Sequence, residues 1–218
     1  MKTKKRAVQR RRRTPEEAKF EIIQVAREFL STHPFRELTV GKLMERTQIG
    51  RSAFYAYFKD VYDLAEIFIH ELARDVESGG AEWIKGEGDR RQEIRTMLSN
   101  GISLWEDHGP MILSLEQAAA LDKRLEAIWR DRIALGPVHR IAQIIRRDQA
   151  AGSIPPMDPV EMSIALNRFN LTYLNDRYGG VRHARDRALV LETLERVWVG
   201  TLYGKTPVMP KKSKRRKS

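Results

Sequence analysis

The chain has 218 residues, of which 41% are hydrophobic and 32% are charged, and its formal net charge is +11. It is long enough to bury a substantial core, and its lack of cysteine excludes disulfides, thiolate metal sites and cysteine nucleophiles. Because no apolar run approaches the roughly 20 residues of a membrane span, and no apolar segment of a secretory signal follows the basic N-terminus, we expect a cytoplasmic protein.

The positive charge is concentrated at the two ends of the chain. Residues 1–13 hold eight lysines or arginines and residues 205–218 hold seven, with no acidic residue in either segment. Together these segments carry +15, so residues 14–204 carry a formal charge of −4. Runs of like charge stay solvated and often bind nucleic acid by releasing counterions. We expect a disordered basic arm and a disordered basic tail, with purely solubilising segments as the alternative.

The N-terminal part of the chain predicts three short helices. Thr14, which precedes a proline and two acidic residues, is typical of a helix start, and this helix is expected to run to about residue 31. Apolar residues at helical spacing indicate a second helix over 40–46 and a third over 51–57. Two short helices joined by a turn can present the second one to the DNA major groove. We therefore assign residues 14–60 as a helix-turn-helix DNA-binding domain.

From residue 61 onward the sequence predicts only helices. Asp60 is expected to cap a long helix that ends near Ser78. Glycine and proline pairs, including Gly109-Pro110, separate the later helices, which are expected at 89–107, 110–119, 122–150, 158–178 and 184–203. The predicted fold class is all-α with about nine helices, an N-terminal three-helix domain and a larger C-terminal bundle. We assign residues 61–204 to ligand binding and dimerisation.

Polar side chains around the third helix are candidates for DNA contact. Arginine can bind guanine O6 and N7 through two hydrogen bonds, with a discrimination of roughly 1–3 kcal/mol. Hydroxyl and ammonium groups can reach phosphate oxygens, and the start of the second helix offers a further anion site. The predicted DNA-binding residues are Thr39, Gln48, Arg51, Ser52, Tyr55, Tyr57 and Lys59. Packing is the alternative for both tyrosines. We favour phosphate contact for Tyr55, because neighbouring phenylalanines already fill the buried face, and leave Tyr57 open.

Residues 39–64, TVGKLMERTQIGRSAFYAYFKDVYDL, resemble the DNA-binding region of TetR-type transcriptional regulators, which are most often homodimeric repressors. The run FYAYF at 54–58 is the most specific part of this resemblance. The chain departs from the family pattern at Gln48, where a glycine is usual, and at Gly50, where a serine or threonine cap is usual. Val61 replaces a lysine that commonly contacts phosphate, and Lys59 is the candidate to substitute for it.

Two segments of the C-terminal half, ALNRFN at 165–170 and VWVGTLYG at 197–204, are similar to the ethionamide-resistance regulator (EthR) branch of that family. This resemblance implies an elongated hydrophobic effector tunnel that includes Asn167, Asn170 and Trp198. Two asparagines three residues apart share a helix face, and burying each without a partner would cost roughly 1–3 kcal/mol. The predicted ligand-binding residues are Met97, Trp105, Trp129, Leu166, Asn167, Phe169, Asn170 and Trp198. Ordinary core packing is the alternative for each of them.

The last two helices carry more apolar faces than one core interface needs, which favours a homodimer built through them. A two-fold axis would place two DNA-binding domains on a palindromic operator, and a monomer with a helical lid is the alternative.

No metal-ligand spacing, phosphate-binding loop or nucleophile motif is present in the sequence, so we expect no cofactor, no metal site and no enzyme activity.

Three hypotheses follow from the sequence. The favoured one is a cytoplasmic, nucleoid-associated regulator of transcription that binds a palindromic operator in double-stranded DNA. It would be a repressor that a small hydrophobic effector releases. The second is a non-specific architectural DNA-binding protein that relies on its basic tails. The third is a small-molecule binding or enzymatic helical domain with incidental basic tails.

Overall fold

The computed structural model describes residues 14–47, 49–79, 88–180 and 186–204, and every regular element in these ranges is a helix. The predicted all-α class is therefore confirmed. The basic arm, the basic tail and Gln48 lie outside the described residues. The α-helices are α1 (Pro15–Leu30), α2 (Val40–Glu45), α3 (Arg51–Phe54), α4 (Val61–Ser78), α6 (Arg90–Leu121), α7 (Lys123–Trp129), α8 (Gly136–Ala150), α9 (Pro159–Tyr178) and α10 (Arg187–Tyr203).

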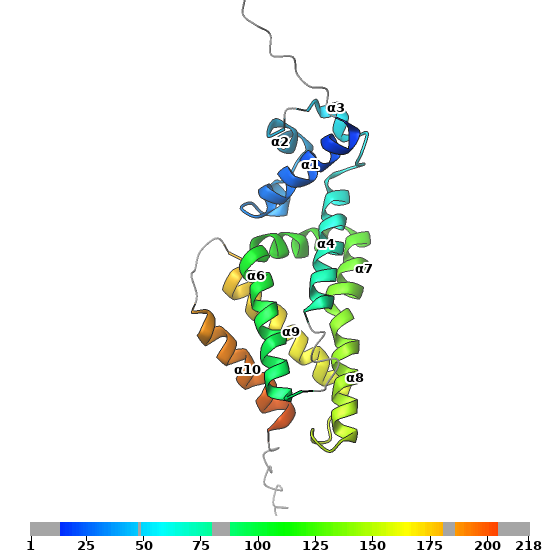
Figure 1. The fold of residues 1–218 in the computed structure, drawn as a ribbon. Helices are drawn as coiled ribbons and strands as arrows, with labels where there is room; N and C mark the ends of the chain where they lie inside the picture. The colour runs from blue at the N-terminus through cyan, green and yellow to red at the C-terminus, as the bar shows by residue number, and fades with distance from the viewer. Residues whose placement is uncertain (1–13, 48, 80–87, 181–185, 205–218) are drawn as a thin grey trace, which may run out of the picture.

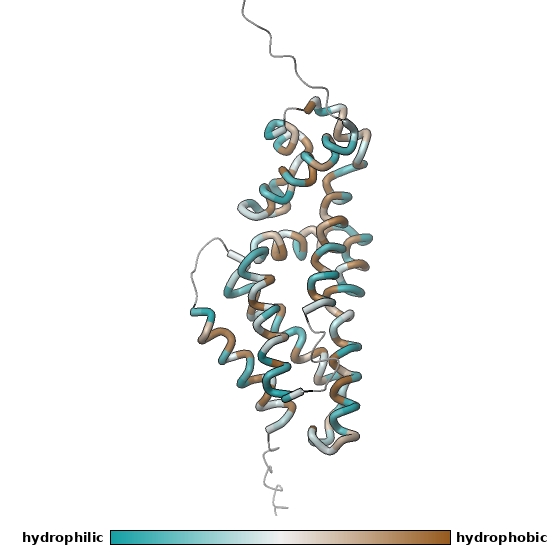
Figure 2. Tube along the Cα trace, in the orientation of Figure 1, coloured by the Kyte–Doolittle hydropathy of each residue, from teal (hydrophilic) through white to brown (hydrophobic). Residues whose placement is uncertain are grey.

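The molecule has a small head, formed by α1 to α3, and a larger body, formed by α6 to α10 (Figure 1). Helix α4 starts at the head and runs down into the body between α6 and α7. Hydrophobic and hydrophilic positions alternate along the helices of both parts (Figure 2). Buried apolar side chains form one continuous cluster that runs from the head through α4 into the body. No helix in the described ranges has both the length and the apolar character of a membrane span.

Side-chain caps fix the starts of α1, α2 and α4. Thr14 accepts a hydrogen bond from the backbone N–H of Glu17, whose carboxylate accepts one from the N–H of Thr14. This reciprocal pair satisfies two donors that a helix start leaves free. Thr39 caps α2 and Asp60 caps α4 through the same kind of bond. The three predicted helix starts are confirmed.

The predicted break at Gly109-Pro110 is wrong, because α6 runs without interruption through Pro110. Residues on both sides of the proline are buried, among them Trp105 and Met111. Gly109 packs directly against the end of α9, where an added Cβ would lie 2.7 Å from the carbonyl carbon of Tyr178. Close packing of α6 on α9 therefore outweighs the helix-breaking tendency of the proline.

The helix predicted over 122–150 is interrupted. After α7, residues Arg130–Ala134 form a π-helical turn, in which the N–H of Leu135 donates to the carbonyl of Arg130 at 2.8 Å. Helix α8 then restarts at Gly136, with Pro137 in its first turn, where the missing N–H of proline costs no helical hydrogen bond. The Gly-Pro dipeptide was a sequence signal for this restart.

Candidate DNA-binding head and ligand cavity

Helix α3 presents polar side chains to solvent and anchors itself with phenylalanines. Phe54 and Phe58 are buried in the core of the head. Arg51 and Ser52, which open α3, are exposed, and Tyr55 is 60% exposed. A large aromatic side chain that is this open to solvent is available to a partner molecule.

The other predicted DNA-binding residues flank this helix. Thr39 and Lys59 are exposed, and the Thr39 side chain accepts a hydrogen bond from the N–H of Lys42 at 3.2 Å. Tyr57 is half-buried and packs on the core, with its ring centroid 6.4 Å from that of Phe58. A packing role for Tyr57 is therefore present in the structure, whereas the Tyr55 ring contacts Phe54 edge-on, with centroids 5.5 Å apart, and is otherwise mostly exposed.

Helix α4 connects the exposed tip of the head to a cavity in the body. Its 18 residues span about 27 Å. The helix begins at the Asp60 cap, two residues after the head core residue Phe58, and its last turn reaches the cavity wall through Asp75 and Val76.

The cavity in the body has a volume of about 500 Å³. Ligand pockets usually fall between roughly 300 and 1,000 Å³ and combine apolar walls with a few polar groups. The walls come from α4, α6, the π-helical turn, α8, α9 and α10. Its lining residues are Asp75, Val76, Ser78, Gly79, Met97, Leu98, Asn100, Gly101, Ser103, Leu104, Trp105, Asp107, His108, Ile133, Pro137, Arg140, Ile141, Ile144, Asn167, Asn170, Leu171, Leu174 and Trp198.

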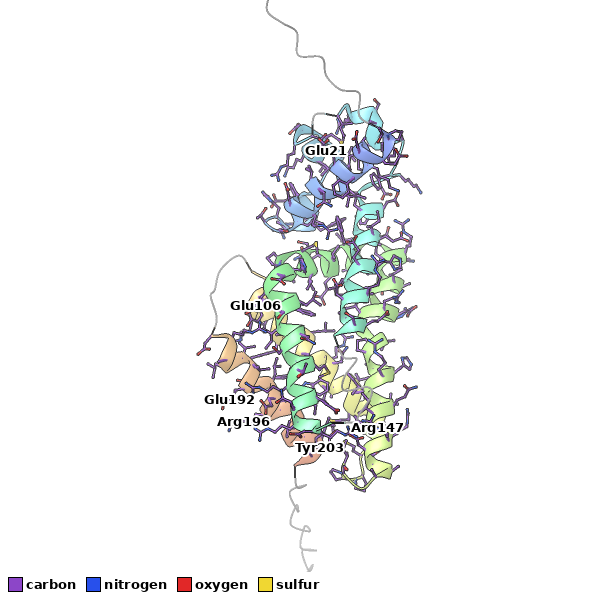
Figure 3. All side chains as sticks on the ribbon, viewed as in Figure 1. Glu21, Glu106, Arg147, Glu192, Arg196 and Tyr203 are labelled. Atoms are coloured by element: carbon purple, nitrogen blue, oxygen red, sulfur yellow. The ribbon has the colours of Figure 1, made fainter. Side chains whose placement is uncertain are left out.

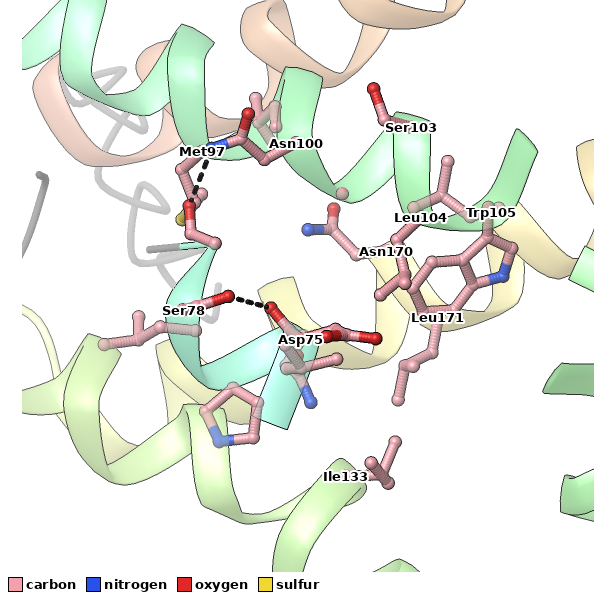
Figure 4. Close-up of a pocket in the computed structure, with 18 of the residues that line it drawn as sticks. Asp75, Ser78, Met97, Asn100, Ser103, Leu104, Trp105, Ile133, Asn170 and Leu171 are labelled. Atoms are coloured by element: carbon pink, nitrogen blue, oxygen red, sulfur yellow. Dashed lines mark hydrogen bonds between the residues drawn. The ribbon is translucent and has the colours of Figure 1, made fainter. Parts of the chain in front are cut away.

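Asn167 and Asn170 on α9 each make one side-chain hydrogen bond to another residue of the cavity region. The indole N–H of Trp198 donates to Oδ1 of Asn170 at 2.9 Å, and Nδ2 of Asn167 donates to the carbonyl of Ala134 at 2.9 Å. The amide nitrogen of Asn170 is directed into the open space of the cavity (Figure 4). The side chain of Asn170 is therefore oriented by Trp198 and keeps a donor for a further partner.

The structure brings five of the eight predicted ligand-binding residues to the cavity wall: Met97, Trp105, Asn167, Asn170 and Trp198. Trp129, Leu166 and Phe169 are not part of the lining. Leu166 is buried and Trp129 is half-buried against the core, while the ring of Phe169 stacks on Tyr173 with centroids 5.5 Å apart.

The sequence prediction missed two parts of the cavity wall. One is the last turn of α4, which carries acidic residues and no basic residue, an unfavourable pattern at a helix C-terminus. The other is the face of α8 that presents Pro137, Arg140, Ile141 and Ile144 at helical spacing. Among the described residues, no group of histidine and acidic side chains is arranged to hold a metal ion.

Comparison with known families identifies both parts of the chain. Residues 22–66 match the family model for "Bacterial regulatory proteins, tetR family", and residues 92–204 match the model for "Transcriptional regulator EthR, C-terminal domain". The chain belongs to the TetR family of transcriptional regulators, with an EthR-type C-terminal domain. It is therefore a DNA-binding regulator of a non-enzymatic family.

Individual TetR-family proteins are similar over most of the chain. The HTH-type transcriptional regulator EthR of Mycobacterium tuberculosis (strain ATCC 25618 / H37Rv) is 23% identical over 195 residues, which cover 84% of this chain and 86% of that protein. EthR of Mycolicibacterium smegmatis is 23% identical over 193 residues, 86% of this chain and 87% of that one.

Solved TetR-family structures share the fold. A regulator of the TetR/AcrR family from Thermobifida fusca superposes with a TM-score of 0.61 at 17% identity, over 83% of this chain and 95% of that chain. AibR, solved in complex with isovaleryl coenzyme A and operator DNA, gives a TM-score of 0.59 at 13% identity, over 86% and 98% of the two chains.

In this TetR-family chain, ion pairs fasten α4 along its whole length. Arg124 of α7 pairs with Asp63 and Glu66 near the start of α4. Arg132 of the π-helical turn pairs with Glu77 in its last turn at 2.9 Å. The head is tied to the same helix by Arg27 of α1, which pairs with Glu71 at 2.7 Å. A displacement of α4 relative to the body must therefore disturb its pairs with Arg124 and Arg132, while the Arg27 pair couples α4 to the head.

Proposed function

We propose that this regulator is a repressor, and that a small lipophilic effector releases it from its operator by filling the cavity in the body. The observation that carries this proposal is the course of α4, which has one end at the DNA-binding head and the other in the cavity wall. The proposed division assigns DNA binding to residues 14–60 and effector binding and dimerisation to residues 61–204. Such a repressor acts in the cytoplasm, at the nucleoid.

In this proposal, the exposed side chains of α3 enter the major groove. Arg51 and Ser52 contact base edges, while Tyr55 and Lys59 hydrogen-bond to phosphate oxygens. Thr39 contributes a further phosphate contact from the start of α2. The exposure of Arg51, Ser52 and Tyr55, and the anchoring of α3 by buried Phe54, support this assignment.

The effector is proposed to be an elongated, mostly apolar molecule. Leucine, isoleucine and tryptophan contribute nine of the 23 lining residues, and Asn170 supplies a donor with a fixed orientation. A ligand shifts a conformational equilibrium only by its difference in affinity for the two states. Converting a 1:99 population into 99:1 requires about 5.5 kcal/mol of such a difference. A ligand that pushes α4 outward binds the DNA-free conformation more tightly than the DNA-bound one if the cavity is larger in the DNA-free conformation.

We further propose a homodimer that pairs α9 and α10 of one protomer with those of its partner. Leu189 on α10 is 60% exposed and Val160 on α9 is 39% exposed, which leaves apolar surface on both helices. A two-fold axis would present two heads to successive major grooves, roughly 34 Å apart on a palindromic operator.

The test is selection of bound fragments from genomic DNA with the full chain, followed by affinity measurements on the recovered duplex. The proposal expects a palindromic site and binding as a dimer, with affinity lost when a matched lipophilic ligand is added. Binding that is the same for every sequence, and that disappears when residues 1–13 and 205–218 are removed, would instead support an architectural DNA-binding protein.

A further inference from the structure

Gly41 in α2 lies against the guanidinium group of Arg51 in α3. A Cβ atom on residue 41 would be 2.9 Å from Nη2 and 3.6 Å from Cζ of Arg51, the first of which is closer than real Cβ contacts allow. Thr39 Oγ1 borders the same space, 3.8 Å from that position. The open face of this glycine is therefore bordered by the Arg51 side chain of α3 and by Thr39, the N-cap of α2, both of which carry a proposed DNA contact.

The backbone of Gly41 gives no other reason for a glycine at this position. Among the glycines that the structure describes, only Gly152 has a positive φ, at 73°. Gly41 sits inside α2, where alanine would favour the helix more than glycine does. The structure shows what the missing side chain makes room for, which is the guanidinium group of Arg51.

We infer that Gly41 is a positioning residue for DNA recognition, because it lets the Arg51 guanidinium rest against α2. This inference rests on the proposed DNA contact of Arg51. An exposed arginine has many rotamers, and ordering it on binding reduces affinity. An arginine that already lies against the neighbouring helix loses less freedom, and its planar group approaches the DNA from a fixed direction.

A side chain at position 41 should displace the guanidinium without harming the fold. The atoms of Arg51 that it would meet are the far end of a flexible, exposed side chain, which can turn away into solvent. Gly41→Ala is therefore expected to keep or raise Tm and to weaken specific DNA binding. If Gly41 served only the stability of the head, Gly41→Ala would lower Tm and leave specific DNA binding by the folded protein unchanged.

The experiment uses the full chain and a duplex recovered by selection from a random-sequence library. Fluorescence anisotropy would give the affinity of the native protein, of Gly41→Ala, of Arg51→Ala and of the double variant. We expect Arg51→Ala to weaken binding by about 10-fold or more, within the range for one arginine–guanine pair, and Gly41→Ala by about 3- to 10-fold. The double variant should match Arg51→Ala alone, because Gly41 acts through Arg51.

Two further measurements separate a positioning role of Gly41 from a general loss of DNA affinity. Gly41→Ala should reduce the preference for the selected duplex over one with a single altered base pair, as Arg51→Ala does. In an Arg51→Lys background, Gly41→Ala should change nothing, because lysine has no Nη2 atom to displace.

The outcomes distinguish this inference from the proposed function. If Arg51→Ala weakens binding but Gly41→Ala does not, or if the two losses add in the double variant, the positioning role of Gly41 is overturned while the DNA contact of Arg51 stands. If Arg51→Ala itself leaves affinity and base preference unchanged, the proposed contact fails, and the inference fails with it.

Discussion

Tyr203, at the end of α10, donates a 2.7 Å hydrogen bond to the carboxylate of Asp148 on α8. Asp148 is buried, and it also accepts a 2.9 Å hydrogen bond from Arg147 and pairs with Arg90 of α6 at 3.1 Å. Arg147 and Tyr203 lie at the lower end of the body (Figure 3). One carboxylate therefore joins three helices at the end of the molecule that is farthest from the head.

This arrangement predicts an acid-sensitive contribution to stability. Burial alone would raise the pKa of Asp148, but hydrogen bonds from Arg147 and Tyr203 and the nearby arginine charges together hold the pKa below its ordinary value. A carboxyl whose pKa is lower in the folded state contributes stability above its unfolded pKa of about 4, and loses it as the pH falls through the folded value.

We expect Asp148→Asn to lower the free energy of unfolding at pH 7 by about 1–2 kcal/mol, because it removes the negative charge that pairs with the partly exposed Arg90 and Arg147. The difference from the native protein should shrink as the pH falls below about 4. Urea unfolding at pH 7 and at low pH measures both effects. Glu28→Gln, at an exposed position on α1, is the control and should change stability little at either pH. A constant difference across the pH range would contradict the assignment.

We predict that a single methyl group added at Gly109 lowers the stability of the protein strongly. Gly109→Ala would press a Cβ against the carbonyl of Tyr178, which is backbone and cannot turn aside. We expect a loss of about 2–3 kcal/mol of unfolding free energy, as for overpacked core sites. Gly101→Ala, in the same helix, has no atom within 4 Å of the added carbon and should stabilise the protein by up to about 1 kcal/mol. Equal stability of the two variants in thermal unfolding would refute the close contact.

Arg124 is predicted to control local order at the start of α4 more than global stability. It donates from Nη1 and Nη2 to Asp63 at 3.1 Å, and Asp63 also accepts the N–H of Lys59 at 2.7 Å. Because the pair is partly exposed, Arg124→Ala should cost no more than about 1 kcal/mol. Amide exchange in the first turns of α4 should nevertheless speed up. Arg130→Ala removes only an exposed pair with its neighbour Asp131 and should leave exchange in α4 unchanged.

Tyr55 is predicted to contact phosphate through its hydroxyl. Tyr55→Phe keeps the ring and should reduce affinity for the selected duplex by about 5-fold, the value of roughly one hydrogen bond. Because a phosphate contact carries no sequence information, the loss should be similar for matched and altered duplexes. Competition binding with both duplexes measures this. A loss confined to the matched duplex would indicate base contact instead.

Local signals in the sequence were enough to predict the helix starts of the head, although α3 ends at Phe54 and not at residue 57. The caps at Thr14, Thr39 and Asp60 depend on residues within one turn, so a short stretch of sequence contains all the interacting groups. The spacing of Phe54 and Phe58 likewise indicates which face of the recognition segment is buried.

The features that the sequence did not predict depend on contacts between distant segments. Pro110 remains helical because α6 packs against the end of α9, about 70 residues further along the chain, at a glycine whose role only the folded neighbour reveals. The cavity wall likewise joins the end of α4 to the start of α8. Helical spacing of apolar residues predicts that Trp129 and Leu166 face the interior of the protein. It does not distinguish a residue that faces a cavity from one that faces the core.

The contact between Gly109 and Tyr178 has a consequence for how the body can move. At this crossing the backbones of α6 and α9 touch with no side chain between them, so the two helices cannot slide past one another there without collision. Under the proposed release mechanism, a bound effector would therefore widen the cavity by moving a wall other than this crossing, and the end of α4 is one such wall.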